Sequence, residues 1–210
     1  MRPPLSRRVL LSTFVASLAI GLPAGCANRS AAQRDPRLDR TLNLTTYYEE
    51  GKLAFLGVDT RPASLIRQGT MLPLPMALAN RTKHSIHLAT EDFTLRDDAG
   101  NLYPLVSYEE YRRDYRRFAA DMKLAEPFYE ATNVHLGLVG PGDPPYRPEP
   151  LPFFGNEGLR RDSLELGSFY FTRGILYFPV PPGGLKRRVF ELHVSSRDLP
   201  EGIFVRFQVP

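Results

Sequence analysis

Few side chains of the kinds that usually do chemistry occur in this sequence, which has one cysteine and four histidines. His84 and His87 form the one close pair, but a spacing of three would put them on opposite faces of a strand. A metal site would need a further ligand from His135 or a distant carboxylate, and no second thiol is available. We therefore expect His84, His87, His135 and His193 to face solvent, with no metal and no cofactor. Metal handling by surface histidines stays as an alternative function.

Neighbouring carboxylates occur as Glu49-Glu50, Glu91-Asp92, Asp97-Asp98 and Glu109-Glu110. Adjacent residues of a strand point to opposite faces, so none of these pairs forms a catalytic dyad by itself. Asp97 and Asp98 in "DDAGN" are explained by a tight turn, although the same oxygens offer an alternative calcium site. No Gly-rich phosphate loop or nucleophile elbow occurs. We predict a non-enzymatic protein; the alternative is a hydrolase or glycan-binding domain that gathers His135 or another histidine with two carboxylates.

In "SYEEYRRDYRRFAADMK", residues 107–123, apolar side chains recur at helical intervals and arginines lie across the polar face, which predicts one inserted amphipathic helix. The apolar stripe consists of Tyr108, Tyr111, Tyr115, Phe118 and Met122. Ser107 and Glu110 have the spacing of an N-terminal capping box. The segment "GPGDPPYRPEPLPF" follows, with six prolines from Pro141 to Pro152, and predicts a surface loop that is neither helix nor central strand. The candidate partner-binding residues are Tyr108, Arg112, Arg113, Arg116, Arg117, Tyr146 and Arg147. Two alternatives remain: the helix charges neutralise one another while its aromatic stripe packs on the domain, and the Pro-rich stretch merely connects elements.

The elements that must position these residues are mainly β-strands. Alternating apolar residues predict seven or eight short strands, in "KLAFLGV", "LPLPMALANRT", "SIHLA", "DFTLRD", "SLELGSFYF", "GILYFPV", "VFELHVS" and "GIFVRFQV". Pro73 and Pro75 lack N–H donors on the same edge, which places the start of their strand at a sheet border. Together the pattern predicts an immunoglobulin-like β-sandwich over residues 45–210, with an insertion at 107–153.

The N-terminus predicts export. Arg2, Arg7 and Arg8 precede an apolar run from Val9 to Leu22, which is short for a permanent transmembrane helix. Residues 1–25 would be removed and three arginines lost, leaving 24 basic against 23 acidic residues. That net charge of +1 gives no support for nucleic-acid binding.

The motif Ala24-Gly25-Cys26 resembles a bacterial lipoprotein signal, in which the cysteine is acylated and becomes the mature N-terminus. The segment "SRRVLL", with Arg7 and Arg8, also resembles a twin-arginine signal. The resemblance implies a protein anchored to the membrane through Cys26, with residues 26–44 as a flexible tether. Ala27 after the cysteine favours the outer membrane where the source has two membranes.

The stretches "ALANRT", "EDFTLRDDAGNLYPL", "GILYFPVPPG" and "FELHV" resemble a bacterial family of exported immunoglobulin-like lipoprotein domains of unknown function. That family has no known catalytic residues, so none is transferred. Sequence and resemblance together predict a lipid-anchored cell-envelope protein that acts as a non-catalytic binding or accessory domain. Its partner would be an envelope protein or a surface polymer.

Overall fold

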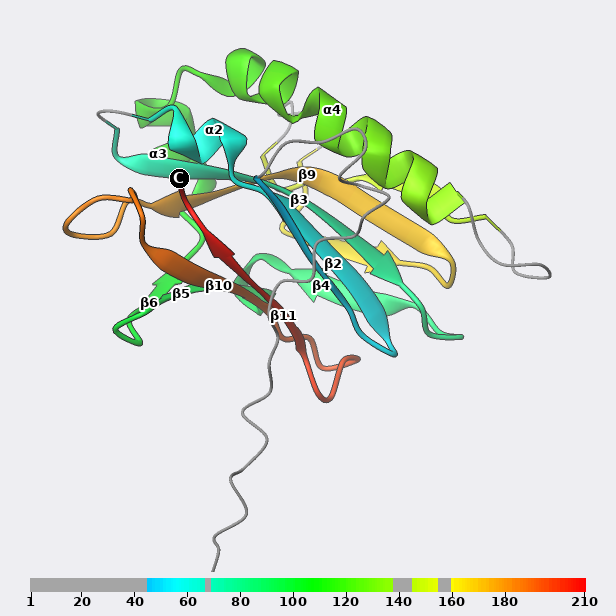
Figure 1. The fold of residues 1–210 in the computed structure, drawn as a ribbon. Coiled ribbons are helices and arrows are strands. Elements are labelled where there is room, and N and C mark those ends of the chain that lie inside the picture. The colour runs from blue at the N-terminus through cyan, green and yellow to red at the C-terminus, as the bar shows by residue number, and fades with distance from the viewer. Residues whose placement is uncertain (1–44, 67–68, 138–144, 155–159) are drawn as a thin grey trace, which may run out of the picture.

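The computed structural model describes residues 45–66, 69–137, 145–154 and 160–210 (Figure 1). The predicted signal with Arg7 and Arg8, the predicted acylation site Cys26 and the 26–44 tether lie outside the described residues. Within them the protein is mainly β, with eleven strands in three sheets. No helix in the described part combines the length and the apolar character needed to cross a membrane.

The largest sheet has five strands in the order β1-β2-β3-β9-β7. These are β1 (Thr46–Glu50), β2 (Ala54–Asp59), β3 (Met71–Asn80), β9 (Tyr170–Pro179) and β7 (Arg147–Pro150). The second sheet, in the order β11-β10-β5-β6, contains β11 (Ile203–Gln208), β10 (Val189–Val194), β5 (Phe93–Asp97) and β6 (Leu102–Pro104). The third pairs β4 (Ile86–Ala89) with β8 (Ser163–Leu166). All pairs are antiparallel except β7 and β9, which are parallel.

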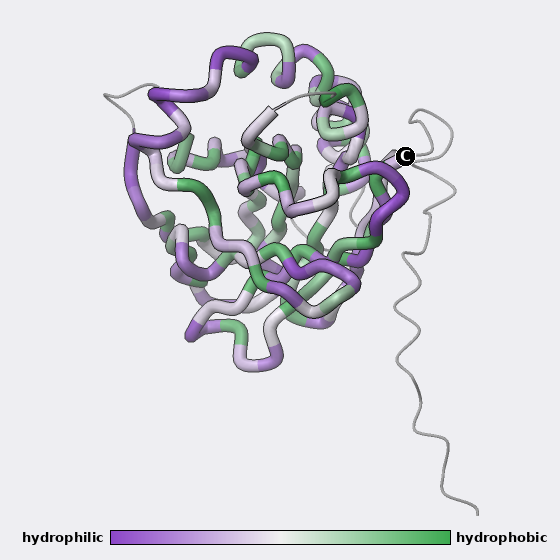
Figure 2. The backbone as a smooth tube through the Cα atoms, turned by 90° about the vertical axis from the view of Figure 1, so that its left-hand side faces the viewer, coloured by the Kyte–Doolittle hydropathy of each residue, from purple (hydrophilic) through white to green (hydrophobic). Residues whose placement is uncertain are grey.

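The helices lie on one side of the five-stranded sheet. They are α2 (Arg61–Ser64), α3 (Tyr108–Asp114) and α4 (Phe118–Gly137), with a short 3-10 turn η1 (Thr90–Asp92) before β5. Figure 1 shows α4 running across β3 and β9, while β10 and β11 lie on the other side of the sheet. The smaller sheets and the helices thus enclose the five-stranded sheet from both faces. Figure 2 shows hydrophobic segments in the middle of the molecule and hydrophilic ones at its periphery.

Two apolar clusters correspond to the two faces of β3, which is buried along its whole length. Leu72, Leu74, Met76 and Leu78 join the main cluster, shared with the two smaller sheets. Ala77 and Ala79 point the other way and join the second cluster beneath α4. Because side chains alternate along a strand, a strand covered on both faces reads as continuously apolar.

The sequence prediction at the start of β3 is confirmed. The pairing of β2 with β3 ends at Met76, so Pro73 and Pro75 are paired with β9 only. Their backbone nitrogens therefore point to the side of β3 on which no strand is paired at these positions, so no hydrogen bond is lost. All eight predicted strands have counterparts, and Phe190, Leu192 and Val194 point inward as expected. The short strands β1 and β7 were not predicted, and β6 was implied only by the turn expected at "DDAGN".

The prediction of one helix at residues 107–123 is wrong in its extent. The capping box is confirmed, since the Ser107 side chain accepts from the Glu110 amide and Glu110 Oε2 accepts from the Ser107 amide at 3.0 Å. However, α3 ends at Asp114 and Tyr115 takes an extended backbone. The longer helix α4 then begins at Phe118 and continues to Gly137. The insertion therefore contributes two helices, and part of its Pro-rich stretch forms the edge strand β7 rather than a loop.

Candidate functional site

The break between α3 and α4 is stabilised by a tyrosine cluster over the end of β9. The rings of Tyr111 and Tyr115 each lie 4.7 Å from that of Tyr177, which is fully buried. The Tyr115 hydroxyl donates to Asp121 in the first turn of α4. Burial raises the pKa of Asp121, while the Tyr115 bond and the nearby Arg117 oppose that rise. These contacts fix the two helices against the sheet.

The predicted partner-binding arginines make mostly local contacts at this end of the molecule. Arg113 forms a bidentate pair with the neighbouring Asp114, at 2.9 and 2.8 Å. Arg116 donates to the Arg112 carbonyl at 2.6 Å, where α3 ends. Arg117 lies 4.0 Å from Asp121. The bond from Arg116 to the Arg112 carbonyl is of the kind that basic residues commonly make at a helix C-terminus, whereas Arg113 and Arg117 are paired with neighbouring carboxylates at the helix junction.

Tyr108 packs with its ring 4.6 Å below the Arg160 guanidinium. Together with Glu109 and Arg112 these two residues line a hollow of about 300 Å³. The second predicted group lies elsewhere: Tyr146 packs against the cluster beneath α4, and Arg147 is exposed above the Tyr170 ring.

The structure does not bring these two groups together. Arg147 is in register with Tyr170 at the start of β9, whereas α3 covers Tyr177 near its end. Seven residues of extended strand separate them, about 23 Å. The seven residues selected from the sequence therefore lie at opposite ends of the sheet, and Arg147, in register with Tyr170, projects from the face away from α4.

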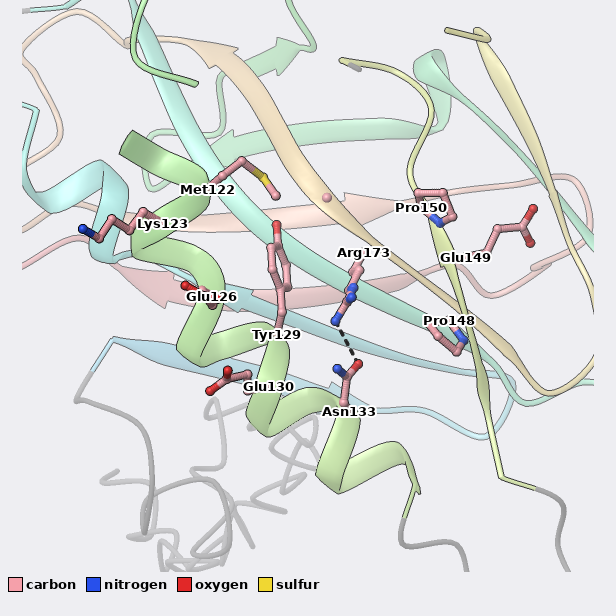
Figure 3. A pocket seen from close by; sticks show the side chains of 11 residues that line it. Met122, Lys123, Glu126, Tyr129, Glu130, Asn133, Pro148, Glu149, Pro150 and Arg173 are labelled. Atoms are coloured by element: carbon pink, nitrogen blue, oxygen red, sulfur yellow. Dashed lines mark hydrogen bonds between the residues drawn. The ribbon is translucent and has the colours of Figure 1, made fainter. Parts of the chain in front are cut away.

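Between those ends lies a groove of about 770 Å³, formed by α4 on one side and β7 on the other (Figure 3). The described lining residues are Met122, Lys123, Glu126, Tyr129, Glu130, Asn133, Pro148, Glu149, Pro150, Arg173 and Gly174. The helix residues recur at intervals of three and four, so they form one stripe of α4. From Met122 to Asn133 this stripe extends about 16 Å.

An arginine on β9 lies at the centre of this groove. Arg173 Nη1 donates to Asn133 Oδ1 at 3.0 Å, and its Cζ lies 5.5 Å from the Tyr129 ring centroid. The Tyr129 ring is 6% exposed, and its hydroxyl has no hydrogen-bond partner among the described residues. Burial raises the pKa of Tyr129, so this hydroxyl is neutral. The arrangement presents an oriented, planar cation on an apolar wall.

The sequence analysis missed this site. Arg173 occurs in "YFTRGILYF", where a charged residue interrupts a long apolar strand, and that interruption was the available signal. The rest of the lining comes from a helix continuing past Pro127 and from a strand made half of proline. Their meeting depends on the tertiary fold.

The histidines do not line the groove. The expectation that His135 faces solvent is wrong, because its side chain is 12% exposed and packs on the Phe55 ring, with Nε2 3.1 Å from Glu50 Oε1. His193 lies 3.0 Å from Glu191. His84 precedes β4 and His87 lies on it. Within the described residues no three His, Cys, Asp or Glu side chains converge as a metal would require. The predicted pocket combining His135 with two carboxylates is therefore not the groove described above.

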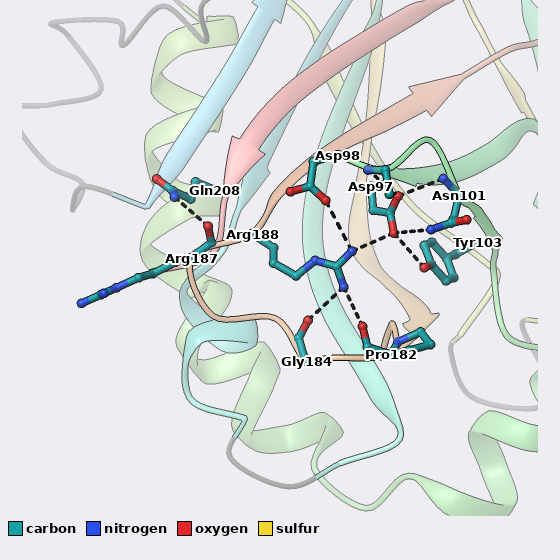
Figure 4. Close-up of polar contacts among 10 residues, drawn as sticks. Asp97, Asp98, Asn101, Tyr103, Pro182, Gly184, Arg187, Arg188 and Gln208 are labelled. Carbon is teal, nitrogen blue, oxygen red and sulfur yellow. Dashed lines mark hydrogen bonds and ion pairs between the residues drawn. The ribbon is translucent and has the colours of Figure 1, made fainter.

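The "DDAGN" segment forms the β5–β6 turn, as predicted, with Gly100 at φ 87° (Figure 4). Asp97 accepts five hydrogen bonds, from the amides of Ala99 and Asn101, the Asn101 side chain, the Tyr103 hydroxyl and Arg188. The bond from the Asn101 side chain contributes most, and together the donors hold the pKa of Asp97 well below its ordinary value. The alternative of a calcium site is wrong here, because protein donors and an arginine already use the carboxylate.

This network predicts a specific acid dependence of stability. A carboxylate whose pKa is depressed by folding stabilises the folded state above its unfolded pKa of about 4, and that contribution fades as the pH falls further. We expect Asp97→Asn to lower the urea midpoint at pH 7. Between about pH 4 and 2 the midpoint of this variant should then fall less than that of the wild type. Glu201→Gln, at an exposed carboxylate outside this network, is the control and should leave both nearly unchanged. If the urea midpoints of the wild type and of Asp97→Asn fall equally between about pH 4 and 2, Asp97 is not the source of this acid dependence.

Comparisons with known proteins leave the chain without a family. No protein-family model matches it, and no curated protein matches it. Among solved structures it is similar to ycdA of Bacillus subtilis subsp. subtilis strain 168, a candidate lipoprotein, with 13% sequence identity and a TM-score of 0.40. That match covers 77% of this chain and 38% of the other, so the chain spans well under half of that protein. A likeness of this size defines neither fold nor function.

Proposed function

We propose that this protein is an exported, lipid-anchored envelope protein that acts as a non-catalytic binding domain. The observation that carries the binding function is the groove between α4 and β7, whose described lining combines an oriented arginine with apolar walls. Its volume of about 770 Å³ falls in the range typical of ligand sites.

The anchor rests on the sequence. Cys26 is the chain's one thiol and follows the small residues Ala24 and Gly25 after an apolar run. A polar tether then leads to the domain at residue 45. We further propose an immunoglobulin-like relationship for the two larger sheets, since face-to-face antiparallel sheets with alternating inward residues are typical of that architecture. The helices and the parallel strand β7 would be additions to it.

The anchor is tested by Cys26→Ser in the full chain with a C-terminal tag. We expect the wild type in the membrane fraction with an acylated N-terminus, and Cys26→Ser released from membranes or left with its signal attached. Asn28→Ala is the control and should behave as the wild type. Fractionation followed by mass spectrometry of the N-terminus is the measurement. A wild-type protein that is unacylated and remains in the cytosol would overturn the proposal.

The binding function is tested by recovery of envelope partners with the tagged protein. Deleting residues 107–153 would remove α4 and expose Phe55 and Phe171, so point variants are required. We compare the wild type with Arg173→Glu, which reverses the charge in the groove, and with Arg206→Glu on β11 as the control. A partner that is recovered with the wild type and with Arg206→Glu, but not with Arg173→Glu, supports the groove as the binding site. Equal recovery from all three proteins contradicts it.

A further inference from the structure

The chemistry of the groove points to the charge of its ligand. Arg173 is opposite Ala77 on β3 and Pro150 on β7, so it projects from the middle of the sheet face that the helices cover. Its guanidinium has five N–H donors. One hydrogen bond to Asn133 and a cation–π contact with the Tyr129 ring, 5.5 Å from Cζ to the ring centroid, position the guanidinium. This geometry leaves further donors of a rigid, planar cation for a ligand.

Arg173 differs from other partly buried arginines of this protein. Arg61, Arg81 and Arg188 each lie within 3.4 Å of a carboxylate oxygen of their own chain. No described carboxylate forms an ion pair with Arg173. An arginine held in a groove without an acidic partner is complementary to a carboxylate, which it can bind through two parallel hydrogen bonds.

The rest of the lining limits the ligand to a single negative charge. Glu126 and Glu130 of α4 line the groove together with one further cation, Lys123, whereas the Glu149 side chain, in register with Thr172, points away from Arg173 (Figure 3). The two glutamates of α4 would repel a phosphate, a polyanion or an anionic membrane surface, because like charges brought together raise the free energy of binding. They favour instead a ligand whose carboxylate is accompanied by an amine.

The edge strand β7 excludes one common mode of peptide binding. Arg147 and Leu151 donate their amides to β9. Because backbone groups alternate in direction along a strand, those of residues 148 and 150 point away from β9, toward the open edge. Those outward positions are Pro148 and Pro150, which have no N–H to donate. A peptide therefore cannot add to this edge as a regular further strand. A ligand in the groove must instead be held by side chains, with Arg173 as the charged contact.

From these observations we infer that the groove binds the free carboxylate of a short, amine-bearing peptide, with Arg173 as its anchor. The groove length of about 16 Å corresponds to roughly four to five extended residues, so a tripeptide fits within it. Met122, Tyr129, Pro148 and Pro150 supply apolar contact for small side chains, and the glutamates receive the amine. Tyr129 acts as a positioning residue, since its ring orients the Arg173 guanidinium. This inference rests on the proposed binding function and names its ligand class.

The test is isothermal titration calorimetry on the protein purified in mild detergent, since the chain has no tryptophan to report binding by fluorescence. The probes are the tripeptide lysyl-alanyl-alanine, its C-terminal amide and inorganic phosphate. We expect the free acid to bind about tenfold or more tighter than the amide, and phosphate to bind more weakly still. Arg173→Met should lose about tenfold or more in affinity for the free acid, and Arg173→Lys, which keeps the charge but not the fork, should fall between.

Two variants of Tyr129 test whether its aromatic ring orients the Arg173 guanidinium or merely fills space. Tyr129→Phe keeps the ring under the guanidinium and should keep binding within about twofold, whereas Tyr129→Leu should weaken it clearly. Arg206→Met, at an exposed arginine of β11, is the control for charge and should bind as the wild type. Thermal melts of every variant establish that each is folded.

Equal affinity for the acid and the amide, phosphate binding as tight as peptide binding, or full binding by folded Arg173→Met would each overturn the inference. Absence of binding to any probe by the folded wild type would also overturn it. In that case the proposed binding function is still judged separately, by whether Arg173→Glu loses its envelope partner. Peptide binding that requires Arg173 supports the inference even where no envelope partner is recovered.

Discussion

Replacing Phe128 by alanine is expected to lower the free energy of unfolding by about 3–5 kcal/mol, the usual cost of truncating a buried aromatic side chain. Phe128 is 1% exposed and lies in the cluster that joins α4 to the five-stranded sheet, with Phe55, Ala77 and Phe171. Urea denaturation followed by circular dichroism measures the change. Because α4 forms one wall of the groove, binding of the tripeptide should fall as well.

The matched control for this change is Val134→Ala on the same helix. Val134 is 62% exposed, so its truncation should alter stability by no more than about 0.5 kcal/mol. A loss below about 1 kcal/mol for Phe128→Ala, with binding retained, would show that α4 is held to the sheet by other contacts.

The strands of this protein are predictable because their environment is simple. In β10, Phe190, Leu192 and Val194 are fully buried, whereas Glu191 and His193 between them are partly exposed. A strand with one face in the core has apolar residues at every second position, and this pattern can be recognised from the sequence alone. Capping at Ser107 and the turn at Gly100 are equally local, and both are confirmed.

The helix α4 could not be predicted in the same way. Pro127 lies in its middle and removes the amide that would bond to the Lys123 carbonyl, which normally indicates the end of a helix. The helix continues because Ala125, Phe128 and Leu136 are buried against the sheet. Packing on a tertiary surface therefore outweighs the local cost of the proline, and that surface is invisible in the sequence.

The groove depends on the same long-range packing. Arg173 and Asn133 are forty residues apart, and their hydrogen bond exists only because α4 lies over β9. The sequence analysis instead selected clusters of charge that are visible locally, such as Arg112, Arg113 and Arg116. Arg113 and Arg116 make their contacts at the helix junction, and Arg112 lines the small hollow beside Tyr108 rather than the groove.

The contact between Gly174 on β9 and Leu151 shows how β7 is held as the second wall. A Cβ atom at position 174 would lie 2.6 Å from Leu151 Cβ and 3.1 Å from its Cδ2. The first of these atoms is attached directly to the backbone, so a change of rotamer cannot relieve the overlap. Leu151 is nearly buried, and its amide donates to the Arg173 carbonyl at 3.0 Å. Gly174 is therefore required for close approach of the segment that follows β7.

We expect Gly174→Ala to lower the free energy of unfolding by about 1–3 kcal/mol, as overpacking typically does. The displaced β7 wall should also weaken tripeptide binding, although residue 174 adds no charge. Gly137→Ala, where a Cβ would meet nothing within 4 Å, is the matched control and should leave both measurements nearly unchanged. Loss of stability with intact binding would mean that the groove tolerates movement of β7 and that Arg173 with α4 forms the essential part of the site. Unchanged stability would instead show that Leu151 can move aside, and the close packing of β7 on β9 would then not be what shapes the groove.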